Sequence, residues 1–462
     1  MFYYYFCGGL NITTMKVYKI VLIVSGLLMA TLLPAQQVRQ MTLQEAIDYA
    51  MEHNYNILKS EKDVEAAKYL VKEKMAYGLP QINANVDYKD NIARPVSLLP
   101  GEFMGQPGTD VEIQFGTRYN ANVGGSLTQL IFSGEYLIGL KASKKFFERT
   151  NVDFFKNKVA LKKQVANSYY NVLATAEALR IIDSTLKTTN KLYLETKQVF
   201  EAGMAEDTDV DQLELLVENL IASQTNFENQ LGVTEAFLKF YLGMESNDSI
   251  VLTEDINSLI EKKKNSLLLQ QQFDYRRNPD YSSLFKQKEI SALQLDLAKS
   301  AYWPSLMANL NAGTNAQRDS WDFFDSKGKW YFSAFWGVTM KIPILSGGMR
   351  MAKVNQAKIA FEQINLMEKQ LVTQLQLQYQ TMKNDYMNTL LVLENKRKNK
   401  TVAAKIYQKT QEKYINGMAS SLDILNTHSQ FLTAENQFIS ASLNFLNAAE
   451  AFEAILTKIQ NQ

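Results

Sequence analysis

The groups with the clearest chemical potential in this sequence are carboxylates that gather in one short segment. Four of them fall within six positions: Glu206, Asp207, Asp209 and Asp211. Acidic residues at the start of a helix accept hydrogen bonds from its free amide groups and suit its dipole. Later in the chain, Ser420 and Asp423 have the spacing of a capping box. If several copies of these carboxylates surrounded a channel opening, they would instead favour cations at that opening. Both interpretations stay open, and they are compatible.

Residues suited to catalysis or metal binding are scarce. The only two histidines, His53 and His428, are each predicted on a helix without a partner motif, and we expect ordinary helix-surface residues. The sequence contains no HExxH motif, no GxSxG motif and no phosphate-binding glycine loop. Lysine plus arginine number 49 against 48 aspartates and glutamates, which argues against nucleic-acid binding. The sequence therefore predicts no enzyme, no cofactor, no metal site and no nucleic-acid partner.

The N-terminal segment predicts export. Met15 is followed by two lysines, an apolar stretch at 20–33 and small residues that suit cleavage before Gln36. We interpret residues 1–35 as a leader with a signal peptide, starting at Met1 or Met15. A single membrane anchor is the alternative, although the apolar stretch is shorter than the ~20 residues of a membrane span. The only cysteine, Cys7, falls in this leader, so we expect no disulfide and no lipid-anchor cysteine in the mature chain.

The chain repeats one structural plan twice. Residues 54–82 align without gaps on residues 278–306, and Asp209 later matches Asp423. Each copy predicts a helix, two strands, a long helix, a turn and a second long helix. The predicted parts are the leader 1–35, a first repeat 36–250, a linker 251–275 and a second repeat 276–462.

The second part of each repeat predicts unusually long helices. Two extended stretches lack proline, a residue that breaks helix interiors. The first long helix is expected over 135–201, about 100 Å at the usual rise per residue. Its apolar residues recur with coiled-coil spacing. Gly203 and Gly417 suit left-handed helix caps. The sequence therefore predicts two antiparallel coiled-coil hairpins, with tips near 201–211 and 415–426.

Polar and apolar residues alternate over four short segments between the helices: 81–88, 119–127, 305–312 and 330–340. Such alternation suits strands of a membrane β-barrel. Three tryptophans in or beside the second pair suit a membrane interface: Trp303, Trp330 and Trp336. Four strands cannot close a barrel and open edges are not allowed in lipid, so several chains must share one barrel. The alternative is a half-buried soluble sheet, and with it a soluble periplasmic coiled-coil scaffold. Residues 89–112 are expected to form an exposed loop.

Several short segments, taken together, resemble the TolC-like outer-membrane efflux proteins. They are residues 43–47 with Asn54 in the opening helix, residues 79–82 and 303–306 entering a strand, residues 132–134 and 345–348 leaving one, and residues 414–417 before a helical turn. Each segment is weak alone, but their order, duplicated over two halves, is specific. The resemblance covers nearly the whole mature chain.

The resemblance implies a mainly α protein with β strands, in which long antiparallel coiled-coil helices form a periplasmic α-barrel. Three chains with four strands each would share a 12-stranded transmembrane β-barrel in outer-membrane lipid. It further implies a homotrimer that is the passive outer-membrane channel of a tripartite efflux or type I secretion system. Its partners would be a periplasmic adaptor protein and an inner-membrane transporter, and its cargo small molecules or proteins.

The resemblance also assigns roles at the tips of the helical hairpins, the expected periplasmic entrance. Asp209 and Asp423 match aspartates that help to close or filter this entrance, and Tyr414 matches a gating tyrosine. Two positions depart from the family pattern: Ala419 replaces a basic gating residue of some members, and Asn426 replaces a second aspartate. The expected entrance residues are therefore Glu206, Asp207, Asp209, Asp211, Tyr414, Asp423 and Asn426.

Overall fold

The computed structural model describes residues 39–105 and 107–459, so the predicted leader over 1–35 lies outside the described residues. The helices are α2 (Leu43–His53), α3 (Tyr55–Ala76), α4 (Gly134–Glu201), α5 (Asp207–Leu242), α6 (Ile256–Lys264), α7 (Pro279–Ser300), α8 (Met349–Ile415) and α9 (Ser421–Leu456). The strands are β1 (Arg39–Met41), β2 (Gln81–Asp90), β3 (Val96–Pro100), β4 (Asp110–Gln114), β5 (Tyr119–Phe132), β6 (Ile250–Leu252), β7 (Ser305–Arg318) and β8 (Tyr331–Lys341). Three short 3-10 helices complete the elements: η1 (Gly101–Met104), η2 (Leu267–Gln270) and η3 (Tyr275–Arg277).

Internal contacts divide the chain into two compact units. The hairpin unit contains the chain up to Tyr55, Leu161–Ser266 and Asp385–Ala451. The sheet unit contains Asn56–Ala160, Leu267–Asn384 and the chain from Phe452. Because α4 and α8 contribute residues to both units, this division cuts across the two predicted repeats, whose boundaries stay a prediction.

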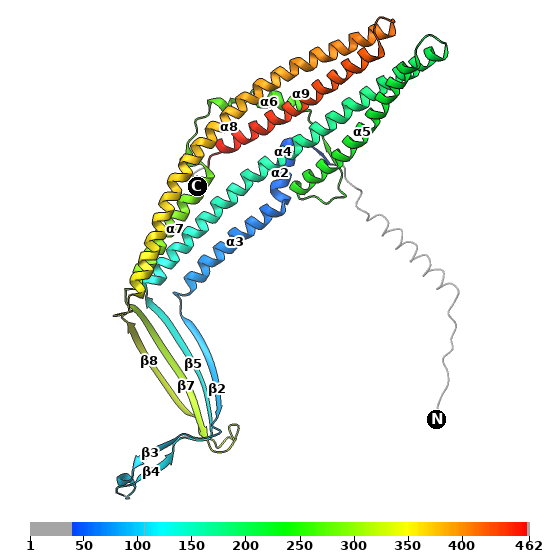
Figure 1. The fold of residues 1–462 in the computed structure, drawn as a ribbon. Coiled ribbons are helices and arrows are strands. Elements are labelled where there is room, and N and C mark those ends of the chain that lie inside the picture. The colour runs from blue at the N-terminus through cyan, green and yellow to red at the C-terminus, as the bar shows by residue number, and fades with distance from the viewer. Residues whose placement is uncertain (1–38, 106, 460–462) are drawn as a thin grey trace, which may run out of the picture. The chain divides into compact units, whose positions relative to one another are not determined.

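The sheet unit is built around an antiparallel sheet with the strand order β2-β5-β7-β8 (Figure 1). Its register places an apolar residue of each strand in one row across the sheet: Ile82, Leu127, Leu310 and Trp336. The next row contains three polar residues, Asn83, Ser126 and Asn311, and ends with Phe335 on β8. Because successive side chains of a strand point to opposite faces, the sheet has one largely apolar face and one largely polar face. The alternation in the sequence predicted this arrangement.

The apolar face and both edges of this sheet are open in the single chain. Ile82 on β2 and Trp336 on β8 are each 77% exposed. β2 and β8 are the outer strands, and no other strand of the described residues pairs with their outer edges. Each edge therefore carries a row of backbone groups without a ladder partner. As for the helices that the structure describes, none has an apolar stretch long enough to cross a membrane.

The segment between β2 and β5 holds a second hairpin that the sequence did not indicate. β3 and β4 pair antiparallel, from Val96 with Gln114 to Pro100 with Asp110, and η1 joins them. The predicted loop over 89–112 is therefore largely folded, although its side chains stay exposed, as Phe103 shows at 81%. β3 and β4 have only five residues each, and β3 ends in a proline, so this segment carries too little alternation to stand out in the sequence.

The hairpin unit is held together around a buried ion pair. The Lys263 ammonium on α6 lies 2.5 Å from the Glu450 carboxylate on α9, and Glu450 is only 3% exposed on its side chain. The Tyr170 hydroxyl of α4 donates to the same carboxylate at 2.7 Å. α6 lies within the predicted linker 251–275, which is therefore a structured segment in its first half. One carboxylate thus connects α4, α6 and α9.

Substituting Glu450→Gln should destabilise the hairpin unit. The Lys263 ammonium would lose its buried carboxylate partner, and breaking a buried ion pair from one side costs about 3 kcal/mol or more. We expect a lower melting temperature of the helical circular-dichroism signal. Glu362→Gln is the matched control, because Glu362 pairs with Lys358 at 4.0 Å on the exposed surface and such pairs contribute under about 1 kcal/mol. Equal melting temperatures for both variants would contradict a stabilising role of the buried pair.

Candidate functional site: the tips of the helical hairpins

The two helical hairpins end in turns of the same construction. α4 ends at Glu201 and α5 begins at Asp207, while α8 ends at Ile415 and α9 begins at Ser421. Gly203 and Gly417 have φ angles of 73° and 70°, which suit glycine because it has no Cβ. The next amide in each turn reaches back into the helix: Met204 N to Val199 O at 3.0 Å, and Met418 N to Lys413 O at 2.8 Å. The left-handed caps predicted from the sequence are therefore present.

Asp423 caps the start of α9. Its carboxylate accepts hydrogen bonds from the Ser420 backbone amide at 2.9 Å and the Ser420 hydroxyl at 2.8 Å. The Asp423 amide in turn donates to Ser420 Oγ at 3.2 Å. These bonds, chiefly the one from the Ser420 amide, hold the pKa of the Asp423 carboxyl below its ordinary value. The cap is therefore present at neutral pH and is lost only as the pH falls through that lowered pKa.

Asp209 has a different role from its counterpart in the second repeat. Its carboxylate accepts a hydrogen bond from the buried Ser421 hydroxyl of α9, and Gln212 Oε1 lies 2.9 Å from the same hydroxyl. The aspartate therefore joins the first turn of α5 to the first turn of α9. Sequence analysis missed Ser421, because only the fold brings together residues separated by 212 positions.

Tyr414 joins the other two helices of the tip. Its hydroxyl lies 3.1 Å from Thr196 Oγ1 on α4, and burial raises the pKa of this hydroxyl, which stays protonated at neutral pH. The Tyr414 ring also packs against an apolar cluster to which all four helices contribute: Leu192, Leu213, Tyr407 and Ile424. The two hairpins are thus held together by one apolar cluster with a polar link on either side.

The remaining predicted entrance residues make no such link between the hairpins. Glu206, Asp207, Asp211 and Asn426 are exposed. Glu206 occupies the N-cap position of α5, but its side chain makes no capping hydrogen bond. The structure therefore brings Asp209 and Tyr414 into contacts between hairpins, uses Asp423 as a cap, and leaves four other groups facing solvent.

His428 lies inside the hairpin unit, so the expectation of a surface residue is wrong for this histidine. It is 1% exposed on α9 and meets the Tyr407 ring edge-on at 5.3 Å between centroids. Burial lowers the pKa of its imidazole to about 4. His53 behaves as expected: it is exposed at the end of α2 and stacks on Tyr49. A histidine at a helical seam position is hard to tell from a surface histidine by sequence alone.

Comparison with known proteins gives the same fold and a family. The sequence matches the outer membrane efflux protein family over residues 46–244 and 277–458. It is 23% identical over 334 residues to the outer membrane protein TolC of Vibrio cholerae, covering 69% of this chain and 68% of that protein. The fold matches the outer membrane protein VceC of Vibrio cholerae with a TM-score of 0.67 at 13% identity, over 90% of this chain and 96% of that one. It matches the CmeC outer membrane channel of Campylobacter jejuni with a TM-score of 0.69 at 16% identity, over 90% and 85%.

The chain belongs to the outer membrane efflux protein family. This membership confirms the resemblance drawn from the short sequence segments and the outer-membrane location that it implied. It also confirms the fold class, since the matched structures share the combination of long helices and strands. This outer membrane efflux protein is accordingly a channel subunit of the outer membrane. The roles of its individual tip residues stay predictions.

The three tryptophans predicted at a membrane interface occupy different levels of the sheet. Trp303 precedes β7 and Trp330 precedes β8. Since β7 and β8 are antiparallel, these two lie at opposite ends of the sheet. Trp336 is the central residue of β8 and pairs with Leu310. In this efflux protein, Trp303 and Trp330 therefore lie at opposite ends of the sheet and Trp336 lies midway between them, and the membrane-interface role of all three stays a prediction.

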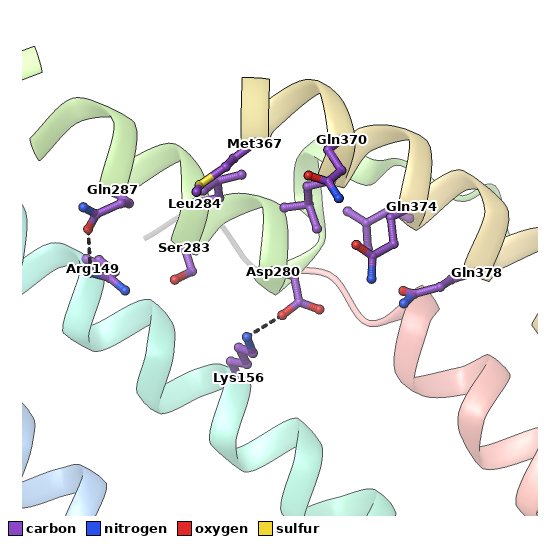
Figure 2. A pocket seen from close by; sticks show the side chains of 12 residues that line it. Arg149, Lys156, Asp280, Ser283, Leu284, Gln287, Met367, Gln370, Gln374 and Gln378 are labelled. Atoms are coloured by element: carbon purple, nitrogen blue, oxygen red, sulfur yellow. Dashed lines mark hydrogen bonds and ion pairs between the residues drawn. The ribbon is translucent and has the colours of Figure 1, made fainter. Parts of the chain in front are cut away.

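A groove of about 490 Å³ in the sheet unit is a second candidate site (Figure 2). It is lined by α4, α7 and α8, including three glutamines of α8, Gln370, Gln374 and Gln378. Its charged groups already have partners: Arg149 donates to Gln287 at 2.6 Å and Lys156 pairs with Asp280 at 2.7 Å. It therefore presents no unpaired charge to a ligand. Nor could any cluster of acidic, histidine or cysteine side chains in residues 39–105 and 107–459 hold a metal ion.

The stability of the hairpin unit should fall as the pH decreases from about 6.5 to about 4. Over this range the unfolded chain binds a proton at His428, whereas the folded chain does not, because its imidazole has a pKa of about 4. The loss should approach about 3 kcal/mol and should level off at lower pH. Thermal unfolding at several pH values measures it.

The variant His428→Phe should lose most of this pH dependence, since an aromatic side chain can replace the imidazole beside Tyr407. His53→Phe is the matched control, because His53 is exposed. An unchanged pH profile in His428→Phe would mean that other groups cause the loss of stability.

Proposed function

We propose that this efflux protein is one subunit of a homotrimeric exit duct that conducts small molecules or proteins and catalyses no reaction. The duct would receive its cargo from an inner-membrane transporter through a periplasmic adaptor protein, in a tripartite efflux or type I secretion system. Family membership supports the channel role. The number of subunits and the partners are the proposed part.

The observation that carries the proposal is the open four-stranded sheet. Small membrane barrels need about eight strands, and unpaired backbone groups cost several kcal/mol each in lipid. Strand directions alternate from β2 through β5 and β7 to β8. β8 of one copy can therefore pair antiparallel with β2 of the next, as every other pair in the sheet does. Three copies would close a barrel without an open edge and would turn the exposed face of Ile82 and Trp336 to lipid.

The helical hairpins supply the periplasmic part of the proposed duct. α4 has 68 residues, about 100 Å at the usual rise per residue. The C-terminal ends of α4 and α8 and the N-terminal ends of α5 and α9 meet in the tip described above. We propose that the tip is the entrance, with Asp209 and Asp423 as its charged groups and Tyr414 as a gating link. Glu206, Asp207 and Asp211 would add negative charge around it, and Asn426 would add a polar group.

The alternative from sequence analysis was a soluble periplasmic coiled-coil scaffold. It accounts for the hairpins but leaves the exposed apolar face of the sheet without a role. Membership of an outer-membrane family argues against it.

The native mass of the detergent-extracted protein tests the trimer. We expect the protein in the outer-membrane fraction, released only by detergent, with the mass of three mature chains by light scattering corrected for detergent. A monomer or dimer that leaves the membrane in carbonate would contradict both the shared barrel and the trimer.

Charge removal at the tip tests the entrance. The variant Asp209→Asn with Asp423→Asn keeps hydrogen-bond acceptors for Ser421 and Ser420 but removes two negative charges per chain. If the carboxylates line the entrance, cation preference in planar bilayers should decrease, seen as a smaller reversal potential in a salt gradient.

The control for this variant removes the same charge from exposed aspartates outside the tip, Asp63→Asn with Asp385→Asn. Equal reversal potentials for the tip variant and the unmodified protein would leave Asp423 as a cap and Asp209 as a link between hairpins, with no part in ion selection.

A further inference from the structure

One face of α5 is a continuous acidic stripe. It consists of Asp207, Asp211, Glu214 and Glu218, which follow one another at intervals of four, three and four residues and are all exposed. No lysine or arginine occurs on α5 before Lys239. Spacings of three and four place side chains on one face of a helix. The first three turns of α5 therefore present four carboxylates in a row.

This acidic stripe points away from the neighbouring hairpin of its own chain. The contacts of α5 with α9 come from Asp209 and Gln212, both beside Ser421, and from Leu216, which packs in a cluster with Leu425. At 3.6 residues per turn, these positions lie on the opposite side of the helix from Asp211, Glu214 and Glu218. The stripe is thus an outer surface of the hairpin unit.

α8 carries a basic stripe with the same kind of spacing. It consists of Lys398, Lys405, Lys409 and Lys413, with the apolar Val402 in the same row, and all five are exposed. The opposite side of α8 is occupied by contacts within the chain: Lys400 pairs with Glu435 of α9 at 2.9 Å, and Tyr407 is buried in the apolar cluster. In the view of Figure 1, α9 and α4 lie between α8 and α5. The basic stripe is therefore a second outer surface.

Contacts within the described part of the chain leave the charges of the two stripes without an ion-pair partner. Within the part of the chain that the structure describes, no ion pair involves Asp211, Glu214, Glu218, Lys398, Lys405 or Lys409. Like charges in a row repel each other, and each row becomes favourable only opposite the other sign. Within one chain the rows cannot meet, because both point outward.

The two stripes lie at the same distance from the tip, and their helices run in opposite directions. Asp209 and Ser421 touch, so the start of α5 lies level with the end of α8, just across the turn from Ser421. α5 runs away from the tip, whereas α8 runs toward it. In an antiparallel pairing, Asp211 therefore faces Lys409 and Glu214 faces Lys405. Asp207 then faces Lys413.

We propose that the acidic stripe of α5 docks on the basic stripe of α8 in a second copy of this chain, with Asp211 opposite Lys409 and Glu214 opposite Lys405. The proposal rests on the trimer proposed above and adds the surfaces that join its subunits at the tips. The contact uses different patches on the two partners, and such a contact closes into a ring when it is repeated around a rotation axis. High salt should weaken it, because the pairs are exposed.

Cross-linking between chains tests the register. In a Cys7→Ser background, the pair Asp211→Cys and Lys409→Cys is treated with a short bis-maleimide in the detergent-purified protein. We expect bands of two and three chains on a denaturing gel. The matched control is Asp211→Cys with Lys398→Cys, which lies on the same stripe but about 16 Å along the helix from the proposed partner. We expect at least a tenfold lower yield from this control.

Three results would overturn the proposal: equal yields from both pairs, a cross-link only within one chain, or no cross-link in a protein whose native mass is that of a trimer. The last result would leave the proposed function intact. A native mass below three chains would instead contradict the trimer itself, so the two failures are distinguishable.

Charge reversal provides an independent measurement. Glu214→Lys and Lys405→Glu should each lower the temperature at which the trimer dissociates, and the double variant should recover most of the loss. Absence of recovery in the double variant would overturn the proposal. A charge reversal that abolishes adaptor binding while cross-links between chains persist would also overturn it, and would assign the stripes to the adaptor.

Discussion

The backbone groups along the outer edges of β2 and β8 need partners that one chain does not supply. In water these groups can bind solvent, but in a bilayer every amide and carbonyl group must be paired within protein. The sheet cannot meet this demand by curling alone, because four strands are too few to form a barrel. Its apolar face, with Ile82 and Trp336 largely exposed, indicates that the sheet does face lipid. The requirement for several copies follows from this constraint.

Each strand of the sheet adjoins one helix. α3 precedes β2 and α7 precedes β7, whereas α4 follows β5 and α8 follows β8. Copies that share a barrel must also bring their outer helices together. Buried pairs such as Lys263 with Glu450 stabilise the inside of one chain, where desolvation demands a partner. In the proposed trimer, the exposed stripes of α5 and α8 would form contacts between copies, where they would add specificity and register more than affinity.

The sequence predicted the large elements well because their signals are long and periodic. The long helix expected over 135–201 is α4, Gly134–Glu201, and the four alternating segments became the four strands of one sheet. The short elements escaped notice for the opposite reason. β3 and β4 have five residues each, and α6 has nine, so none of the three gives a repeating pattern that stands out from a loop. His428 lies at a buried seam position of α9, although the polarity of its side chain suggested an exposed position.

For the tip, the sequence by itself determined the turns and the cap. Gly203 and Gly417 take left-handed conformations, and Ser420 with Asp423 forms a capping box, because these features depend on residues within a few positions of each other. Only the tertiary structure decided which hydrogen-bond partner each carboxylate has within the chain. Asp209 and Asp423 match in the repeat, yet one contacts Ser421 in the other hairpin and the other caps its own helix. The physical reason is that hydrogen bonds between helices depend on how the hairpins pack, and packing joins residues that lie some two hundred positions apart in the chain.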